Sequence, residues 1–144
     1  RIKGLDGNEK MGKSLGNAIY LVDSEEEITK KVMGALTDTN KIKKDDKANP
    51  DVCMVYYYHK LVNDDVKTVC EECKNGLRGC VLCKKELINK LNEYLKEFKT
   101  RRKYYEDNPE LVEEIIKEGT EKALTKAEET IKKVKESMKI NYFE

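Results

Sequence analysis

Residues 82–98 have the sequence LCKKELINKLNEYLKEF, in which apolar side chains recur every three or four positions. This spacing is that of one face of an α-helix, because 3.6 residues complete a turn. The side chains on this face are Leu87, Ile88, Leu91, Tyr94, Leu95 and Phe98. We therefore predict a long helix over residues 82–105 whose apolar face packs against other helices.

Signals for helix starts flank this segment on both sides. Ser24 stands three residues before Glu27, which is the arrangement of a capping box. Asparagine–proline pairs at residues 49–50 and 108–109 combine a capping residue with proline at the first helical position. The predicted helices cover residues 25–36, 50–61, 63–73, 82–105 and 109–138. Residues 18–22 form a short apolar run, which is either a strand or a buried connector. Because every element predicted after this run is a helix, we predict a mostly α protein.

The amino-acid composition excludes some classes of protein. The 144 residues include 29 Lys and Arg against 28 Asp and Glu, for a net charge of +1. Charged residues make up 40% and apolar residues 38%, which is typical of long amphipathic helices. This balance excludes a strongly basic, histone-like binder and an acidic tail, although it is compatible with a local basic surface. No apolar run approaches the roughly 18 residues of a membrane span, so we expect no membrane partner.

Five cysteines lie within about thirty residues: Cys53, Cys70, Cys73, Cys80 and Cys83. An odd, closely spaced set is a poor disulfide framework, and we expect metal binding in a reducing compartment instead. One possible ligand set is the local group Cys70, Cys73, Cys80 and Cys83, which resembles a zinc knuckle with a short spacer. The other set replaces Cys70 with the more distant Cys53. His59, the only histidine, is predicted to be a packed or surface side chain rather than a ligand.

Residues 7–14, GNEKMGKS, match the phosphate-binding pattern G-x-x-x-x-G-K-[ST] letter for letter. A P-loop runs directly into a helix, whereas Leu15-Gly16-Asn17 disfavours one. The chain also lacks an acidic strand end downstream that would hold magnesium. We therefore disfavour a P-loop here.

The same segment carries a second motif, KMGKS at residues 10–14, followed by LGNAI at residues 15–19 and SEEEI at residues 24–28. This series resembles the KMSKS signature loop and its continuation in the tryptophanyl-tRNA synthetase family, with Gly12 in place of the usual serine. The resemblance implies an ATP-binding loop made of Lys10, Met11, Gly12, Lys13 and Ser14, with Mg²⁺ accompanying ATP. Lys10 and Lys13 would be the catalytic residues, since ammonium groups stabilise the negative charge that grows on departing pyrophosphate.

The resemblance extends to the cysteines. Cys53-x19-Cys73-x6-Cys80-x2-Cys83 is similar to the pattern of bacterial family members that carry a [4Fe–4S] cluster, with a first spacer about three residues shorter. The flanking residues NPDVC (49–53) and GCVLCKK (79–85) are similar as well. The resemblance therefore implies that these four cysteines hold the cluster and that Cys70 is spare. Zn²⁺ is the alternative metal.

The resemblance implies a division into residues 1–22, the loop at the C-terminal edge of a class I Rossmann-type catalytic domain, and residues 23–144, a helical anticodon-binding bundle. The expected activity is ATP-dependent activation of tryptophan and its transfer to tRNA(Trp), by a cytoplasmic enzyme that forms a homodimer. Because the chain starts at Arg1 inside a motif, we expect it to be the C-terminal part of that enzyme and inactive alone. One alternative is a stand-alone metal-stapled RNA-binding module, and another is an iron–sulfur redox carrier. Lys122, Lys126 and Lys133, on one stripe of the last helix, are either solvated or contact tRNA phosphates.

Overall fold

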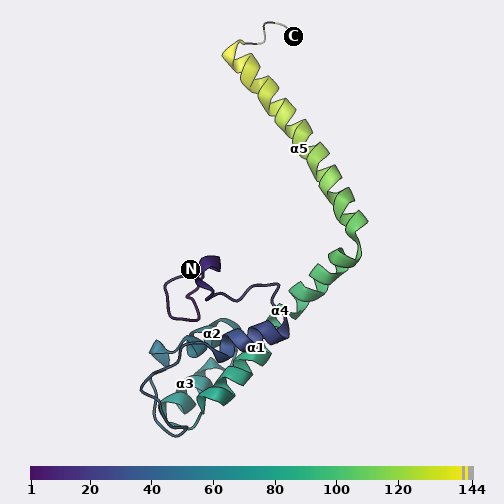
Figure 1. The fold of residues 1–144 in the computed structure, drawn as a ribbon. Helices are drawn as coiled ribbons and strands as arrows, with labels where there is room; N and C mark the ends of the chain where they lie inside the picture. The colour runs from purple at the N-terminus through teal and green to yellow at the C-terminus, as the bar shows by residue number, and fades with distance from the viewer. Residues whose placement is uncertain (141, 143–144) are drawn as a thin grey trace. The chain divides into compact units, whose positions relative to one another are not determined.

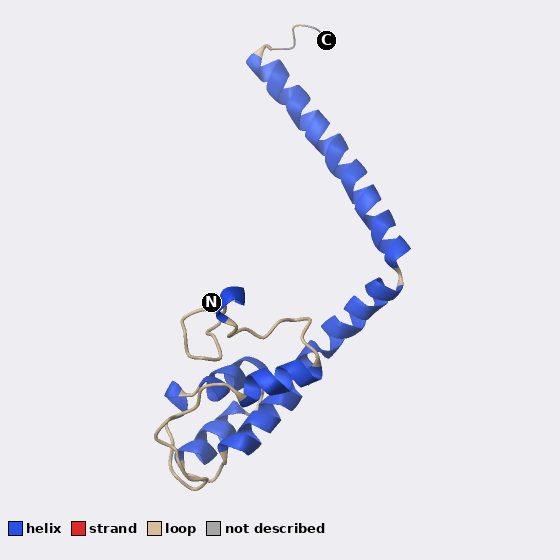
Figure 2. Ribbon diagram, viewed as in Figure 1, coloured by secondary structure: helices blue, strands red, loops and turns tan. Residues whose placement is uncertain are grey.

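The structure is a computed structural model that describes residues 1–140 and 142. Its α-helices are α1 (Glu25–Met33), α2 (Met54–Val62), α3 (Val66–Lys74), α4 (Cys80–Asp107) and α5 (Pro109–Met138), with 3-10 turns η1 (Lys13–Leu15) and η2 (Pro50–Val52) (Figure 1). Figure 2 shows helices and loops, and the described residues contain no strand. The prediction of a mostly α protein is confirmed, and the apolar run at residues 18–22 is a connector with Ala18 buried. None of the described helices is long and apolar enough to cross a membrane.

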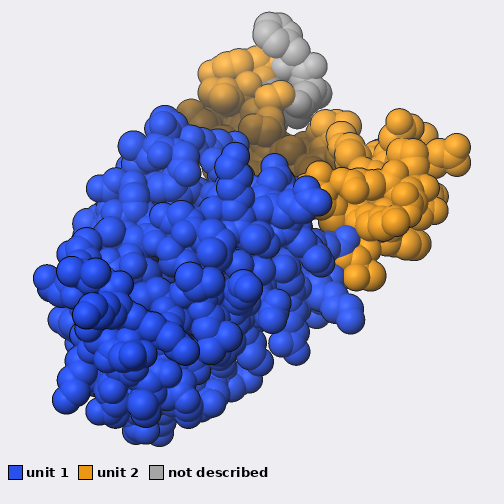
Figure 3. Space-filling model, turned by 60° about the horizontal axis from the view of Figure 1, so that its bottom comes forward, with its two compact units in different colours: residues 1–99 blue, residues 100–144 orange. Residues whose placement is uncertain are grey.

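The chain divides into two compact units, residues 1–99 and 100–144, and the boundary falls within α4 (Figure 3). The first unit has one hydrophobic core, to which α1, α2, α3 and α4 all contribute. The core side chains from these helices are Ile28 and Val32, Val55 and Tyr58, Val69, and Cys83, Leu87, Ile88, Leu91 and Leu95. In the second unit, α5 has no buried residue.

The apolar face predicted for the long helix is correct at four of its six positions. Leu87, which is fully buried, lies on this face with Ile88, Leu91 and Leu95, whose exposed fractions are at most 7%. Tyr94 and Phe98 were expected in the core, but they are 68% and 39% exposed. Tyr94 lines an open pocket beside Lys60 and Lys90, and Phe98 lies next to the end of the first unit.

Helix boundaries follow the predicted caps with local exceptions. Ser24 and Glu27 form both bonds of the capping box at the start of α1. The Asn49-Pro50 signal starts only the short turn η2, because Cys53 then adopts an extended conformation and α2 begins one residue later. Asn63 ends α2, and its side chain accepts a hydrogen bond from the Asp65 backbone at the turn into α3.

A backbone hydrogen bond joins residues 1–23 to the segment after α1, and further bonds join that segment to α2 and α4. The Leu36 N–H donates to the Leu5 carbonyl, and the Met54 N–H donates to the Leu36 carbonyl. Lys84 on α4 adds two bonds from its ammonium group to the carbonyls of Met33 and Ala35 at the end of α1. The N-terminal loop and the cysteine-bearing helices therefore belong to the same unit.

Candidate functional site

The motif residues 10–14 lie on a loop that ends in one 3-10 turn. Gly12 precedes the turn η1 in an extended conformation, and Gly16 ends it with a φ of 64°, in the left-handed region that favours glycine. A P-loop would continue from Ser14 into an α-helix. The described chain instead leaves the turn after three residues, as expected for a segment in which a P-loop is disfavoured.

Asn17 is the buried residue that holds this loop. Its side-chain oxygen accepts the Gly12 N–H at 2.9 Å, and its amide nitrogen donates to the Lys10 carbonyl at 3.3 Å. The same nitrogen donates to Asp6 at 2.9 Å, and this bond is the main reason that the pKa of Asp6 is lowered. A Cβ at Gly4 would lie 2.2 Å from that nitrogen, so residue 4 must be glycine for Asn17 to fit. Sequence reasoning missed Asn17, although a polar residue directly after Gly16 was visible in the motif.

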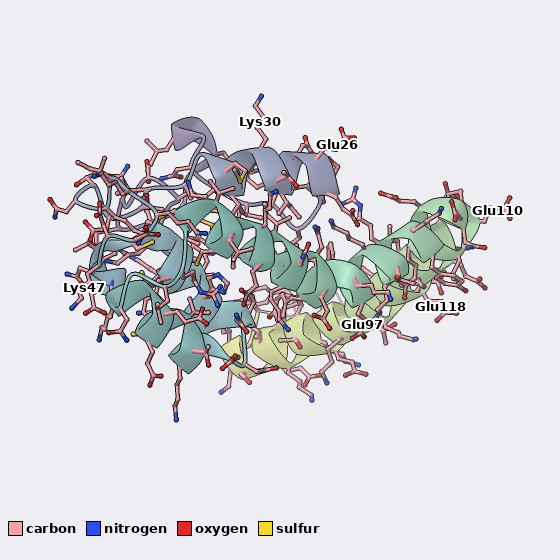
Figure 4. All side chains as sticks on the ribbon, turned by 90° about the horizontal axis from the view of Figure 1, so that it is seen from below. Glu26, Lys30, Lys47, Glu97, Glu110 and Glu118 are labelled. Atoms are coloured by element: carbon pink, nitrogen blue, oxygen red, sulfur yellow. The ribbon has the colours of Figure 1, made fainter. Side chains whose placement is uncertain are left out.

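The polar side chains of the loop are accessible to a ligand. Lys10, Lys13 and Ser14 are exposed, while Met11 is half-buried and packs against the core. An open cleft of about 490 Å³ adjoins the turn, and its lining includes Leu15, Asn17 and the α1 lysines. Figure 4 shows Lys30 of α1 projecting outward, as does Glu26. The loop therefore has a backbone held by hydrogen bonds from Asn17, and its two lysine side chains are exposed to solvent.

A second cluster lies in the helical part, where cysteines from three elements line one small cavity of about 20 Å³. Cys53 lies at the start of α2, Cys73 on α3, and Cys80 and Cys83 on the first turn of α4. The remaining lining residues are Thr37, Val55, Tyr56, Val69 and Arg78. Cys70 is not among them, and all five cysteines are free thiols.

Four of these thiols line one cavity, but they do not form a ready-made metal site. Burial raises the pKa of Cys53 and Cys73, and it raises the pKa of Cys83 to about 12. Within residues 1–140 and 142, no group of three or more His, Cys, Asp or Glu side chains already has the geometry of a metal site. Four thiols are nevertheless a donor set for zinc or for an iron–sulfur cluster. The cavity has room for about one water molecule, so a cluster would require its walls to move apart.

Two polar residues that sequence reasoning did not assign to the site adjoin this cavity. Arg78 lines it directly and is 9% exposed. His59 is fully buried, as a packed side chain, and its Nε2 lies 3.5 Å from the Cys83 sulfur. Burial lowers the pKa of His59 and keeps the ring neutral at neutral pH. The sequence signal for His59 was weak, because Cys83 lies 24 residues further along the chain.

Comparison with known proteins gives a consistent result. Residues 2–134 match the model of the family described as tRNA synthetases class I (W and Y). The chain is 40% identical over 143 residues to the tryptophan–tRNA ligase of Aquifex aeolicus, covering 97% of this chain and 36% of that protein. It is also 40% identical to the corresponding ligase of Streptococcus mutans, covering 99% of this chain and 44% of the relative.

Solved structures show the same similarity. The crystal structure of tryptophanyl-tRNA synthetase from Campylobacter jejuni, complexed with ADP and tryptophan, aligns with a TM-score of 0.85 at 27% identity. The alignment covers 96% of this chain and 43% of that structure. The chain therefore spans less than half the length of these relatives.

Proposed function

The chain belongs to the class I tRNA synthetase family of W and Y enzymes, and we propose that it is part of a tryptophan–tRNA ligase. This part supplies the ATP signature loop and a helical region that binds tRNA(Trp). The observation that carries the proposal is the Lys10–Ser14 loop, pinned by Asn17, in a chain whose relatives at 40% identity are named tryptophan–tRNA ligases. The expected place in the C-terminal part of the enzyme stays a prediction.

The role proposed for the loop follows from its charges. Activation of tryptophan by ATP forms the aminoacyl adenylate and expels pyrophosphate, so negative charge grows on the departing phosphates. Lys13 stabilises this charge and Lys10 assists, because both ammonium groups are exposed on a backbone that Asn17 holds in place. Met11, Gly12 and Ser14 complete the loop, and Mg²⁺ accompanies the nucleotide.

A pyrophosphate-exchange assay on the full-length enzyme tests this role. Lys13→Ala is expected to lower tryptophan-dependent exchange roughly 10²- to 10³-fold, the usual effect of removing a group that stabilises developing charge. Lys47→Ala is the matched control, since it removes an exposed lysine outside the motif. Equal activity of both variants and the parent would exclude the proposed role of Lys13.

The proposed tRNA-binding role of residues 23–144 is supported by a basic cleft. This cleft of about 540 Å³ is lined by Lys41, Lys43, Lys44 and Lys85 together with apolar side chains that include Ile42 and Leu82. Ammonium groups bind the phosphate backbone, and apolar side chains pack against unstacked bases.

We expect the full-length enzyme to act as a cytoplasmic homodimer.

We further propose that Cys53, Cys73, Cys80 and Cys83 hold a metal centre. The support is their common cavity, which excludes Cys70. The resemblance to cluster-bearing enzymes indicates [4Fe–4S], and Zn²⁺ is the alternative; either metal would require the thiols to move into ligand geometry. Either metal would supply cross-links between the start of α2, α3 and α4.

Metal analysis with an anaerobic absorption spectrum tests the centre. A broad band near 400 nm and bound iron in the parent, both abolished in Cys53→Ser, would support the cluster. Cys70→Ser, on α3 one turn before Cys73, is the matched control and is expected to keep the metal. Zinc that survives in Cys53→Ser but not in Cys70→Ser would favour the local zinc knuckle instead.

The second candidate function is an RNA-binding module without catalysis, which the basic cleft beside the thiols also suits. Binding of tRNA(Trp) without any effect of ATP or of Lys13→Ala would favour the module. Loss of ATP binding in Lys13→Ala favours the ligase.

A further inference from the structure

We propose that Tyr57 and Tyr58 of α2 are positioning residues for ATP, because their hydroxyl groups hold the backbone segment to which the motif loop is bonded. The inference rests on the ATP-binding role proposed for residues 10–14. Neither tyrosine belongs to the loop, and both act through the two peptide groups on either side of Lys3.

The peptide group between Ile2 and Lys3 joins α2 to the motif loop. Its carbonyl oxygen accepts the N–H of Met11, the second residue of the motif, at 3.2 Å. Its N–H points the opposite way, as in any planar trans peptide, and donates to the Tyr57 hydroxyl oxygen at 3.5 Å. The peptide group therefore cannot rotate without weakening a contact at one of its ends.

The next peptide group, between Lys3 and Gly4, forms a second bridge in the reverse sense. Its carbonyl oxygen accepts the Tyr58 hydroxyl, and its N–H donates to the Asn8 carbonyl at 2.9 Å. Asn8 stands two residues before Lys10, where the chain enters the motif. Both peptide groups at Lys3 are thus bonded to α2 on one side and to the loop or its approach on the other.

The position of the two tyrosines makes them suitable anchors. Tyr58 is 3% exposed, and its ring belongs to the core of the first unit. The ring of Tyr57 packs edge-on against that of Tyr58, with centroids 5.6 Å apart. Burial raises the pKa of Tyr58, so its hydroxyl stays protonated and donates at neutral pH.

These bridges matter for ATP because the ammonium groups of Lys10 and Lys13 can meet phosphates only where the loop backbone places them. Asn17 holds this backbone at Gly12, whereas the bridges hold it at Met11 and at its approach. A loop that is fixed before binding loses less conformational freedom when the nucleotide binds. Loss of a tyrosine hydroxyl should therefore weaken the binding of ATP and leave that of tryptophan unchanged.

The test is pyrophosphate exchange by the full-length enzyme, with ATP and tryptophan varied in turn. Tyr58→Phe and Tyr57→Phe each remove one hydroxyl and keep the ring. Tyr94→Phe is the matched control, because Tyr94 is 68% exposed on α4 and lines a pocket with Lys60 and Lys90. Amide hydrogen exchange of a peptide that includes Met11 is a second readout, which does not depend on activity.

We expect Tyr58→Phe to raise the KM for ATP roughly 3- to 10-fold, the factor that corresponds to one net hydrogen bond, with the KM for tryptophan unchanged. Tyr57→Phe should act in the same direction with a smaller factor, because its contact is long. Amide exchange around Met11 should be faster in both variants, and Tyr94→Phe should match the parent. If Tyr58→Phe does not fold, Tyr57→Phe must show both effects.

Two results would overturn the inference. A KM for ATP and a rate of amide exchange equal to the parent's in both variants would show that the tyrosines act only in packing. Equal rises in the KM for ATP and for tryptophan would show a general loss of structure. A parent without ATP-dependent exchange would instead remove the proposed function itself, and the positioning role with it.

Discussion

The single carboxamide of Asn17 contacts the motif loop at two backbone positions, Lys10 at its start and Gly12 at its middle. Its bonds to Gly12 and Lys10 hold the backbone that leads from Lys10 towards Lys13, and its bond to Asp6 holds the carboxamide itself. The resemblance of the motif to a signature loop implied roles for Lys10 and Lys13, and those roles stay predictions. It did not predict Asn17, since the role of that residue depends on a fold that brings residue 6 beside residue 17.

Replacement of Asn17 by Ala leaves the Gly12 N–H and Asp6 without these partners. We expect a decrease of about 1–3 kcal/mol in the stability of the loop and a lower kcat/KM for ATP in the full-length enzyme. Pyrophosphate exchange at varied ATP concentration measures the change in kcat/KM. Asn8→Ala is the control, because Asn8 also bonds to Asp6 but does not contact the motif. Similar decreases in both variants would contradict the role assigned to Asn17.

Asp38 makes the stability of the first unit dependent on pH. Its carboxylate accepts the backbone N–H groups of Asn49 and Asn40, which lower its pKa below the ordinary value of 3.8. The unfolded chain therefore binds the proton more readily than the folded chain, and stability falls as the pH drops below about 4. Urea unfolding at several pH values measures this dependence.

Asp38→Asn is expected to be less stable at pH 7 and to show a smaller decrease in stability between pH 5 and pH 3. Asp64→Asn, an exposed carboxylate in the turn between α2 and α3, is the control. An unchanged acid dependence in Asp38→Asn would contradict the assignment.

At the scale of the element, α4 carries both core side chains and two of the cysteines, Cys80 and Cys83. Its apolar spacing predicted the helix and four of its core positions, because periodicity reports which face is buried. Periodicity could not show that Tyr94 and Phe98 lie where neighbouring helices no longer cover them. In the same way, the Asn49-Pro50 cap predicted a helix start but not the extended Cys53 that delays α2.

Substitutions on α4 test whether Leu87 belongs to the core and Tyr94 lies outside it. Leu87→Ala is expected to cost about 2–5 kcal/mol in the free energy of unfolding, because it leaves a cavity in the core. Tyr94→Ala should change stability by no more than about 0.5 kcal/mol, since the side chain is largely exposed. Denaturant unfolding compares the two, and equal destabilisation would show that the core extends to Tyr94.

At the scale of the whole molecule, the sequence predicted the family and the mostly helical class. The spacing of the cysteines left two ligand sets open, and the structure brings together the set that includes Cys53. The basic cleft was not predicted, because its lysines come from a loop and from α4 and meet only in the folded chain. The division into residues 1–22 and 23–144 stays a prediction about function, and the compact units have a different boundary.

Removal of lysines from two regions tests which one binds tRNA. The combined variant Lys43→Ala, Lys44→Ala and Lys85→Ala is expected to weaken tRNA(Trp) binding and to reduce its salt dependence by about one unit for each phosphate that is no longer bound. Pyrophosphate exchange, which needs no tRNA, should stay unchanged. The matched triple variant at Lys122, Lys126 and Lys133 on α5 removes the same charge. If only the α5 variant weakens binding, the cleft is not the tRNA site.

The most direct measurement is pyrophosphate exchange by the full-length enzyme with tryptophan and with tyrosine, the two amino acids that the family accommodates. We predict exchange that depends on tryptophan, is negligible with tyrosine, and falls roughly 10²- to 10³-fold in Lys13→Ala. Exchange with tyrosine alone, or tryptophan-dependent exchange in Lys13→Ala at the parent's rate, would contradict the proposed function.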